Sequence, residues 1–228
     1  MNLKLTDKTY MIDNIWAFVF SADEEIDYSA GEYVRVQLNH DNPDEKGPKR
    51  FFTNSAPPYE GVIQITTRLT GSTFKDALGQ LSVGDDALQL IKPHEGDFVW
   101  RDTDKPILFV AAGIGVTPYY SILMQRVYEG KDIPVTLLYN GRSELLPWRN
   151  EFAALQEANP EFKVEYQIGE RITPENLHEQ FPKLNESLVY LSGPEPMVED
   201  VGEGLKQLGL PEDQLMQDWF PNYDGGNY

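Results

Sequence analysis

The chain has 228 residues, of which 40% are hydrophobic and 12% aromatic, and 37 acidic and 19 basic side chains give it a formal net charge of −18 at pH 7. This composition excludes disorder as the main state and allows one large core or two of ordinary domain size. The negative field would repel nucleic acid, so no nucleic-acid partner is expected. Cysteine is absent, which excludes disulfides and thiolate-held zinc or iron–sulfur centres in this chain.

Metal, membrane and export signals are also missing from the sequence. The three histidines, His40, His94 and His178, are scattered without metal-ligand spacing, so no metal site is expected. No stretch approaches the roughly 20 apolar residues of a membrane span. The N-terminal residues lack the apolar core of a signal peptide, and we therefore expect a cytoplasmic protein without a membrane span.

The first hundred residues contain short alternating apolar segments separated by turn-forming residues. Strands are predicted at residues 16–20, 33–38, 62–66 and 88–90, and one helix from Ser72 to Leu81 interrupts them. Short strands at this rhythm indicate an antiparallel β-barrel or sandwich.

After Asp102 the pattern changes to strands that alternate with helices. The predicted strands are 107–112, 135–139, 163–168, 187–191 and 215–220, and the predicted helices are 119–128, 149–158, 174–180 and 197–208. Continuous apolar strands with crossover helices indicate an α/β fold with a doubly wound parallel sheet. Two domains are therefore predicted, 1–102 and 103–228. The last helix is the weakest prediction, because Gly202 and Gly204 each cost about 1 kcal/mol relative to alanine.

The apolar strand 107–112 leads directly into the segment Gly113-Ile114-Gly115-Val116-Thr117-Pro118. This order predicts a strand, a tight turn and a helix, with Thr117 as N-cap and Pro118 at the first helical position. Backbone N–H groups and the positive end of the helix dipole would suit a phosphate there. An ordinary turn between a buried strand and its helix explains these residues equally well.

The first half contains two more candidate phosphate sites. In one, Arg50 offers a positive fork, Phe52 a flat face and Thr53 a hydroxyl, a combination that suits a flat aromatic ligand with a phosphate. In the other, the segment 71–74 follows Arg68 and opens a helix. An arginine on a strand edge and a simple N-cap are the structural alternatives.

Taken in order, five motifs resemble those of the ferredoxin-NADP reductase-like superfamily of flavoenzymes. They are R-x-F-T at 50–53, G-S-T-F at 71–74, G-D-F at 96–98, G-x-G-x-x-P at 113–118 and S-G-P-E-P-M at 192–197. The resemblance spans nearly the whole chain. It implies an FAD-binding antiparallel β-barrel followed by an NAD(P)-binding α/β domain, with FAD and either NADP or NAD as cofactors.

The resemblance also implies roles for individual residues on the flavin side. Arg50 would bind the FAD pyrophosphate, Phe52 would stack on the isoalloxazine ring, and Thr53 would lie near the flavin N5. The implied flavin-binding set is Arg50, Phe51, Phe52, Thr53, Thr67, Arg68, Gly71, Ser72, Thr73 and Phe74.

On the nicotinamide side, the turn would receive the dinucleotide and the second glycine motif would shape the nicotinamide pocket. The implied residues are Gly113, Ile114, Gly115, Val116, Thr117, Pro118, Ser192, Gly193, Pro194 and Met197. Asn140, Arg142 and Ser143 would face the adenosine ribose. An Arg and a Ser without an acidic residue at the strand end favour NADP slightly over NAD, although an exposed arginine without a specific role is nearly as good an explanation.

The chain departs from the family pattern at three places. Ser192 stands where many members have a cysteine beside the hydride-donating carbon, and Phe52 replaces the commoner tyrosine. The C-terminal segment from Asp218 is similar to an acid-x-Phe ending, and Asp218 could serve protons. Tyr223, Tyr228 or Trp219 could cover the flavin; a core position for Trp219 and a frayed terminus for Tyr228 are the alternatives.

The resemblance therefore implies an NAD(P)H-dependent FAD oxidoreductase with Thr53, Ser192 and Asp218 at the reacting atoms. Electrons would pass to a separate acceptor, a ferredoxin or flavodoxin or a small molecule. Ferredoxins and flavodoxins are usually acidic, so the negative charge of this chain would repel them unless basic residues cluster near the flavin. Five basic residues group in the sequence around the expected flavin site: Lys46, Lys49, Arg50, Arg68 and Lys75. Two alternatives stay open: a flavin or ferric reductase with diffusible flavin, and an FAD-binding electron-relay or non-catalytic subunit.

Overall fold

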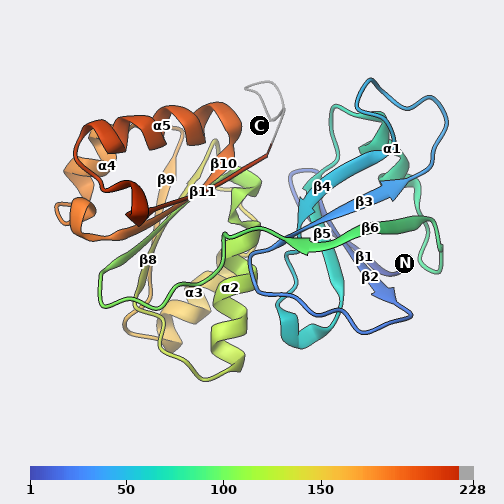
Figure 1. Cartoon of the computed structure of the whole chain (residues 1–228), viewed down its shortest axis with the longest axis horizontal. Coiled ribbons are helices and arrows are strands. Elements are labelled where there is room, and N and C mark those ends of the chain that lie inside the picture. Colours follow the sequence, from blue (N-terminus) through green and yellow to red (C-terminus); the bar gives the residue numbers. More distant parts are fainter. Residues whose placement is uncertain (221–228) are drawn as a thin grey trace. The chain divides into compact units, whose positions relative to one another are not determined.

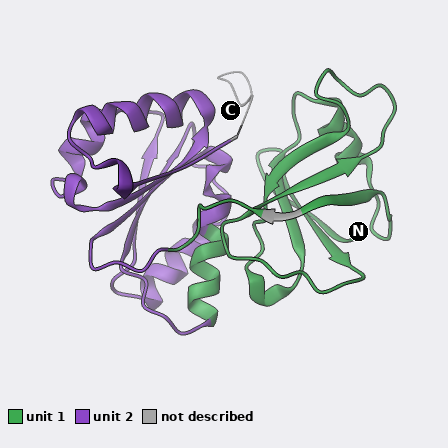
Figure 2. Ribbon diagram, viewed as in Figure 1, with its two compact units in different colours: residues 1–100, 120–128 green, residues 101–119, 129–228 purple. Residues whose placement is uncertain are grey.

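A computed structural model describes residues 1–220, except for the side chains of Pro93, His94 and Phe220. The chain forms two compact units, one of residues 1–100 with 120–128 and one of residues 101–119 with the chain from 129 onward (Figure 2). Tyr223 and Tyr228 lie outside the described residues. The predicted domain limits, 1–102 and 103–228, remain a prediction.

The first unit is built on a six-stranded antiparallel sheet (Figure 1). Its strands follow the order β4-β3-β6-β1-β2-β5. Just after β4, the Ser55 N–H donates to the Gln64 carbonyl of β5 at 3.0 Å, so the chain returns from one end of this order to the other, as a barrel requires. The predicted antiparallel fold is confirmed. The strand bounds are β1 (Asn2–Ile12), β2 (Ile15–Ala22), β3 (Tyr33–Leu38), β4 (Lys49–Thr53), β5 (Ile63–Arg68) and β6 (Leu88–Glu95).

Strand β1, like β4, is absent from the strands that the apolar pattern predicted. Within it only Leu3 and Leu5 are fully buried, and the following residues are mostly exposed. Its pairing with β2 runs from Leu3 opposite Ala22 to Ile12 opposite Ile15, with two register shifts. Strand β1 is therefore defined by its backbone pairing with β2, and such pairing produces no periodic pattern of apolar residues in the sequence.

Helix α1 (Thr73–Gln80) covers the core of the first unit. Its Phe74 and Leu78 are fully buried and belong to the same apolar cluster as the inward side chains of the strands, and Phe52 of β4 packs against that cluster. Ser72 is the N-cap, and its hydroxyl accepts a hydrogen bond from the Lys75 N–H at 3.2 Å.

The second unit is a five-stranded parallel sheet in the order β11-β10-β7-β8-β9. The predicted doubly wound α/β fold is confirmed. Strand β7 lies between β8 and β10, so the chain reverses its direction of winding there, and ligands of such sheets bind at the carboxyl ends of the strands at this point. The bounds are β7 (Ile107–Ala112), β8 (Val135–Gly141), β9 (Lys163–Ile168), β10 (Leu188–Pro194), β11 (Leu215–Phe220), α2 (Thr117–Tyr128), α3 (Arg149–Ala158), α4 (Pro174–Gln180) and α5 (Glu195–Gln207).

Helix α5 forms despite its two glycines because both lie at close contacts. A Cβ on Gly202 would come within 3.1 Å of Gln217 Cδ on β11, and one on Gly204 within 2.8 Å of Pro174 Cβ on α4. The two glycines lower the helix propensity, but because they carry no side chain they allow α5 to pack closely on its neighbours. Within residues 1–220 none of the helices has the length and apolar character that a bilayer crossing needs.

Candidate functional site

The turn after β7 differs from the predicted one. Gly113 to Val116 form a 3-10 turn, η2, in which Gly113 has φ of +55°, and this turn runs directly into α2. Thr117 has helical angles of −55° and −47°, and its Oγ1 donates to the Ile114 carbonyl at 3.1 Å. The prediction of Thr117 as N-cap is therefore wrong, because its hydroxyl bonds back to the turn rather than to the helix. Pro118 is the second residue of α2.

The carboxyl ends of β7 and β10 meet at this turn. A Cβ on Gly115 would lie 2.6 Å from the Ser192 carbonyl carbon and 2.7 Å from Gly193 Cα, so only glycine fits. A Cβ on Gly193 would lie 2.6 Å from Met197 Cε and 3.0 Å from Ala112 Cβ. The structure thus brings together two motifs that are about 80 residues apart in the sequence, at the point where such sheets bind ligands.

Ser192 and Asp218 lie side by side on neighbouring parallel strands. Ser192 is fully buried, it pairs in register with Asp218, and its Oγ donates to Asp218 Oδ2 at 3.3 Å. Tyr119 of α2 is also fully buried, and its hydroxyl donates a hydrogen bond to the Val110 carbonyl at 3.0 Å. Burial, followed by the charge of Asp218, raises the pKa of Tyr119 well above its ordinary value.

Sequence reasoning did not single out Tyr119, because a tyrosine at the start of an apolar helix carries no signal of its polar partners. Trp219, the next residue after Asp218, is 49% exposed, so a core position for it is wrong.

The residues expected at the adenosine ribose follow β8. Asn140 is engaged elsewhere: its Nδ2 donates to the carbonyls of Gln167 at 3.0 Å and Glu170 at 2.7 Å, and so ties the end of β8 to the end of β9. Arg142 and Ser143 are exposed, and the Ser143 hydroxyl accepts from the Leu145 N–H at 3.3 Å.

On the flavin side, β4 and α1 bring four expected residues together. The Phe52 ring packs on Phe74 with centroids 5.8 Å apart, and the Arg50 guanidinium lies 5.3 Å from the same Phe74 ring. Thr73 precedes Phe74 in the helix. Phe51 points away from this group, as alternation along a strand requires; it is 48% exposed and contacts Tyr33 edge-on.

Thr53, at the end of β4, has a buried hydroxyl that lacks a hydrogen-bond partner among the described residues. The side chain is 4% exposed. A buried, unsatisfied hydroxyl costs about 1–3 kcal/mol, and each such group calls for an explanation. A flavin ring placed at Thr53 would supply the partner, so this residue fits the expected cofactor.

The remaining expected flavin residues lie at the end of β5 and in the turn after it. Arg68 donates to Asp13 Oδ2 at 2.7 Å and also to the Asp13 carbonyl, in the turn between β1 and β2. Thr67 is buried opposite Trp16. Gly71, with φ of +76°, makes the turn before the Ser72 N-cap, a conformation that favours glycine.

Arg50 is also paired with an aspartate. Its Nη2 donates to both carboxylate oxygens of Asp44, at 2.6 and 2.7 Å. Burial alone would raise the pKa of Asp44, but the hydrogen bond and charge of Arg50 outweigh it and lower that pKa. Both arginines expected at the FAD phosphates therefore carry an acidic partner from their own chain.

Comparison with known proteins agrees with this geometry. Residues 109–203 match the family model described as "Oxidoreductase NAD-binding domain". The Flavohemoprotein of Pseudomonas aeruginosa is 25% identical over 206 residues, covering 85% of this chain and 51% of that protein. The chain spans about half the length of the curated relatives it matches first.

Two solved structures share the fold of nearly the whole chain. One is the flavohem-like FAD/NAD binding domain of nitric oxide dioxygenase from Vibrio cholerae O1 biovar El Tor, with a TM-score of 0.79, 20% identity, and coverage of 96% of this chain and 98% of that one. The other is the ferredoxin-NADP+ reductase from Plasmodium falciparum, with a TM-score of 0.79, 14% identity, and coverage of 96% and 95%.

Proposed function

We propose that this chain is a member of the ferredoxin-NADP reductase-like superfamily and an NAD(P)H-dependent FAD oxidoreductase that delivers electrons to a separate acceptor. The observation that carries the proposal is the close approach of the Gly113–Val116 turn to Ser192 and Gly193 at the point where the sheet reverses its winding. The buried hydroxyl of Thr53, which has no hydrogen-bond partner within residues 1–220, supports a flavin in the first unit.

When bound, the nicotinamide supplies a hydride that the flavin N5 accepts, and the flavin can release electrons one at a time. The chain supplies position and electrostatics. The η2 turn and the start of α2 receive the dinucleotide phosphates, and Gly193 and Met197 shape the nicotinamide position. Asp218 accepts a hydrogen bond from the Ser192 hydroxyl and thereby fixes the orientation of that hydroxyl.

In the first unit, Phe52 offers its ring to the flavin and Thr53 its buried hydroxyl. Arg50, Arg68 and the start of α1 hold the phosphate end of FAD. For the nicotinamide cofactor we propose NADP over NAD, because Arg142 and Ser143 are both exposed just past β8.

The acceptor is proposed as a separate molecule. A ferredoxin or flavodoxin is one class and a small molecule is the other. Of the five basic residues expected near the flavin, Arg50 and Arg68 are each paired with an aspartate, and Lys75 is buried. Of the five, only Lys46 and Lys49 are exposed and form no ion pair with the described residues. This favours the small-molecule acceptor over an acidic protein.

Anaerobic mixing of the FAD-loaded protein with NADH and with NADPH tests the proposal. We expect the absorbance of oxidised flavin to bleach, faster with NADPH. Flavin that is retained but not reduced by either nucleotide would instead indicate an electron-relay subunit. Flavin that is lost on gel filtration, with NAD(P)H oxidation only when free flavin is added, would indicate a reductase of diffusible flavin.

A further inference from the structure

The loop between β3 and β4, residues 39–48, contacts the Arg50 guanidinium, which is expected to hold the FAD phosphate, through Asp44, Lys46 and Gly47. Arg50 Nη2 donates to both oxygens of Asp44. Arg50 Nη1 donates to the carbonyls of Gly47 at 2.7 Å and Lys49 at 2.8 Å, with that of Lys46 at 3.3 Å. Each terminal nitrogen of an arginine carries two N–H groups, so acceptors from this stretch of chain match all four.

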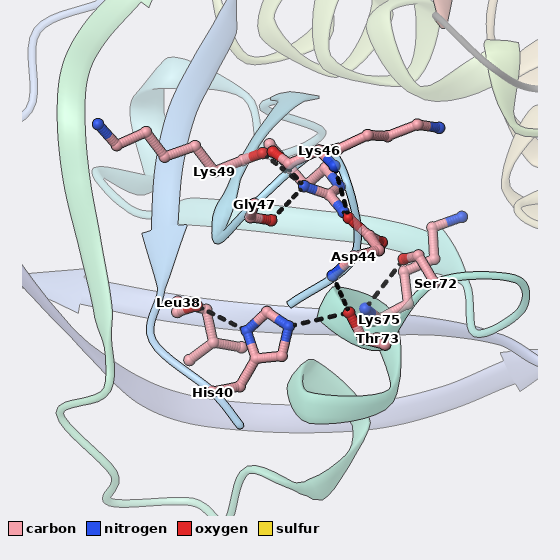
Figure 3. Close-up of polar contacts among 10 residues, drawn as sticks. Leu38, His40, Asp44, Lys46, Gly47, Lys49, Ser72, Thr73 and Lys75 are labelled. Atoms are coloured by element: carbon pink, nitrogen blue, oxygen red, sulfur yellow. Dashed lines mark hydrogen bonds and ion pairs between the residues drawn. The ribbon is translucent and has the colours of Figure 1, made fainter. Parts of the chain in front are cut away.

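The same loop also engages Thr73, the first residue of α1. The Asp44 N–H donates to Thr73 Oγ1 at 3.1 Å, and His40 Nε2 lies 3.1 Å from the same oxygen. The base of the loop is closed by the Leu38 N–H, which donates to the Pro48 carbonyl at 3.0 Å. Two expected phosphate ligands, Arg50 and Thr73, are therefore held by a single loop. Figure 3 shows His40 and Asp44 of this loop at Thr73.

We infer that Asp44 is an affinity-determining residue of the flavin site: its carboxylate competes with the cofactor phosphate for Arg50, and the loop 39–48 must move before the phosphate binds there. The inference rests on the proposed function. A carboxylate and a phosphate take the same bidentate position on a guanidinium. The Arg50 side chain is only 15% exposed, and two anions on one fork would repel each other.

The competition acts only on flavins that carry a phosphate. Replacing Asp44 by asparagine keeps the shape of the side chain and an oxygen for the Lys46 N–H, which donates to Asp44 Oδ1 at 3.0 Å, but removes the charge. We expect D44N to bind FAD roughly tenfold more tightly than the wild-type chain does. Riboflavin, which lacks a phosphate, should bind both proteins equally.

The matched control is E45Q, because Glu45 lies in the same loop, is exposed, and undergoes the same change of charge. The measurement is titration of flavin fluorescence with wild-type, D44N and E45Q protein, using FAD and riboflavin. Unchanged FAD binding by D44N would overturn the inference, since Asp44 would then not compete with the phosphate. Weaker FAD binding would also overturn it, since Asp44 would then position Arg50 for the phosphate. An equal gain in E45Q would also overturn it. Absence of binding of both flavins to all three proteins would overturn the proposed function itself.

The wild-type chain offers a second test that needs no variant. If loop movement precedes phosphate binding, the observed association rate of FAD should level off as its concentration rises, whereas that of riboflavin should stay linear. A linear dependence for FAD over the range in which riboflavin is linear would contradict the competition.

Discussion

At the residue scale, the buried hydroxyl of Thr53 links stability and flavin binding. The change Thr53→Val removes a group that lacks a partner among the described residues, so we expect the flavin-free chain to become more stable by about 1 kcal/mol. FAD binding should become several-fold weaker, because the flavin loses a hydrogen bond. Chemical denaturation and flavin titration measure the two effects.

Thr66→Val serves as the control for that experiment. The Thr66 hydroxyl is buried like that of Thr53 but shares a hydrogen bond with Ser55 Oγ at 2.8 Å. Its removal should therefore lower the free energy of unfolding. A loss of stability in both variants would show that the Thr53 hydroxyl is already satisfied without flavin.

Ionisation of Tyr190 is expected to lower the free energy of unfolding at alkaline pH. Burial raises the pKa of Tyr190 to about 12, while the Arg101 N–H donates to its hydroxyl at 3.0 Å. A tyrosine whose pKa is higher in the folded than in the unfolded state stabilises the fold fully below about pH 10, and this contribution is lost as the pH rises toward about 12. Tyr119 acts in the same direction.

Urea denaturation at about pH 8 and about pH 11 measures this loss. The variant Y190F cannot ionise at this position, so its free energy of unfolding should fall less between the two pH values than that of the wild-type chain. An equal fall would assign the alkaline loss to other groups.

At the scale of elements, the packing of the η2 turn on β10 depends on Gly115. In Gly115→Ala the new methyl group would meet the Ser192 backbone, which cannot rotate away. We expect a loss of about 1–3 kcal/mol in the free energy of unfolding, together with weaker NADPH binding, because the turn and β10 must separate. Thermal or chemical unfolding and nucleotide titration measure these changes.

Gly79→Ala is the matched control for that variant. Its Cβ would lie 2.9 Å from Leu69 Cδ1, the tip of a flexible side chain, and Gly79 lies inside α1. Alanine there gains about 1 kcal/mol of helix propensity, which should offset the movement of Leu69. A Gly115→Ala chain as stable as this control would contradict the close packing of turn and strand.

At the scale of the whole molecule, the net charge of −18 governs the approach of an acceptor. Because Arg50 and Arg68 are compensated by aspartates, we expect turnover with an acidic acceptor protein to rise as salt screens the repulsion. Turnover with an uncharged acceptor should not change. A steep fall with salt would instead show docking through Lys46 and Lys49.

The sequence predicted most of the fold because the relevant signals are local. Alternating apolar residues identified the antiparallel half, continuous apolar strands identified the parallel half, and Gly71 and Ser72 marked the start of α1. Strand β1 was missed since only Leu3 and Leu5 of its residues are fully buried. Nothing in its pattern reports the backbone pairing with β2.

The sequence by itself therefore determined the fold class and the order of most elements, because periodicity and glycine placement act over a few positions. The candidate site residues were predicted from the resemblance of its motifs to those of a known superfamily. Only the tertiary structure decided how those residues are engaged. It paired Arg50 with Asp44 and Arg68 with Asp13 and turned the Thr117 hydroxyl back to Ile114. It also left the Thr53 hydroxyl without a hydrogen-bond partner in the described part of the chain. These outcomes depend on which side chains meet after folding, and contacts across loops and between strands carry no period in the sequence.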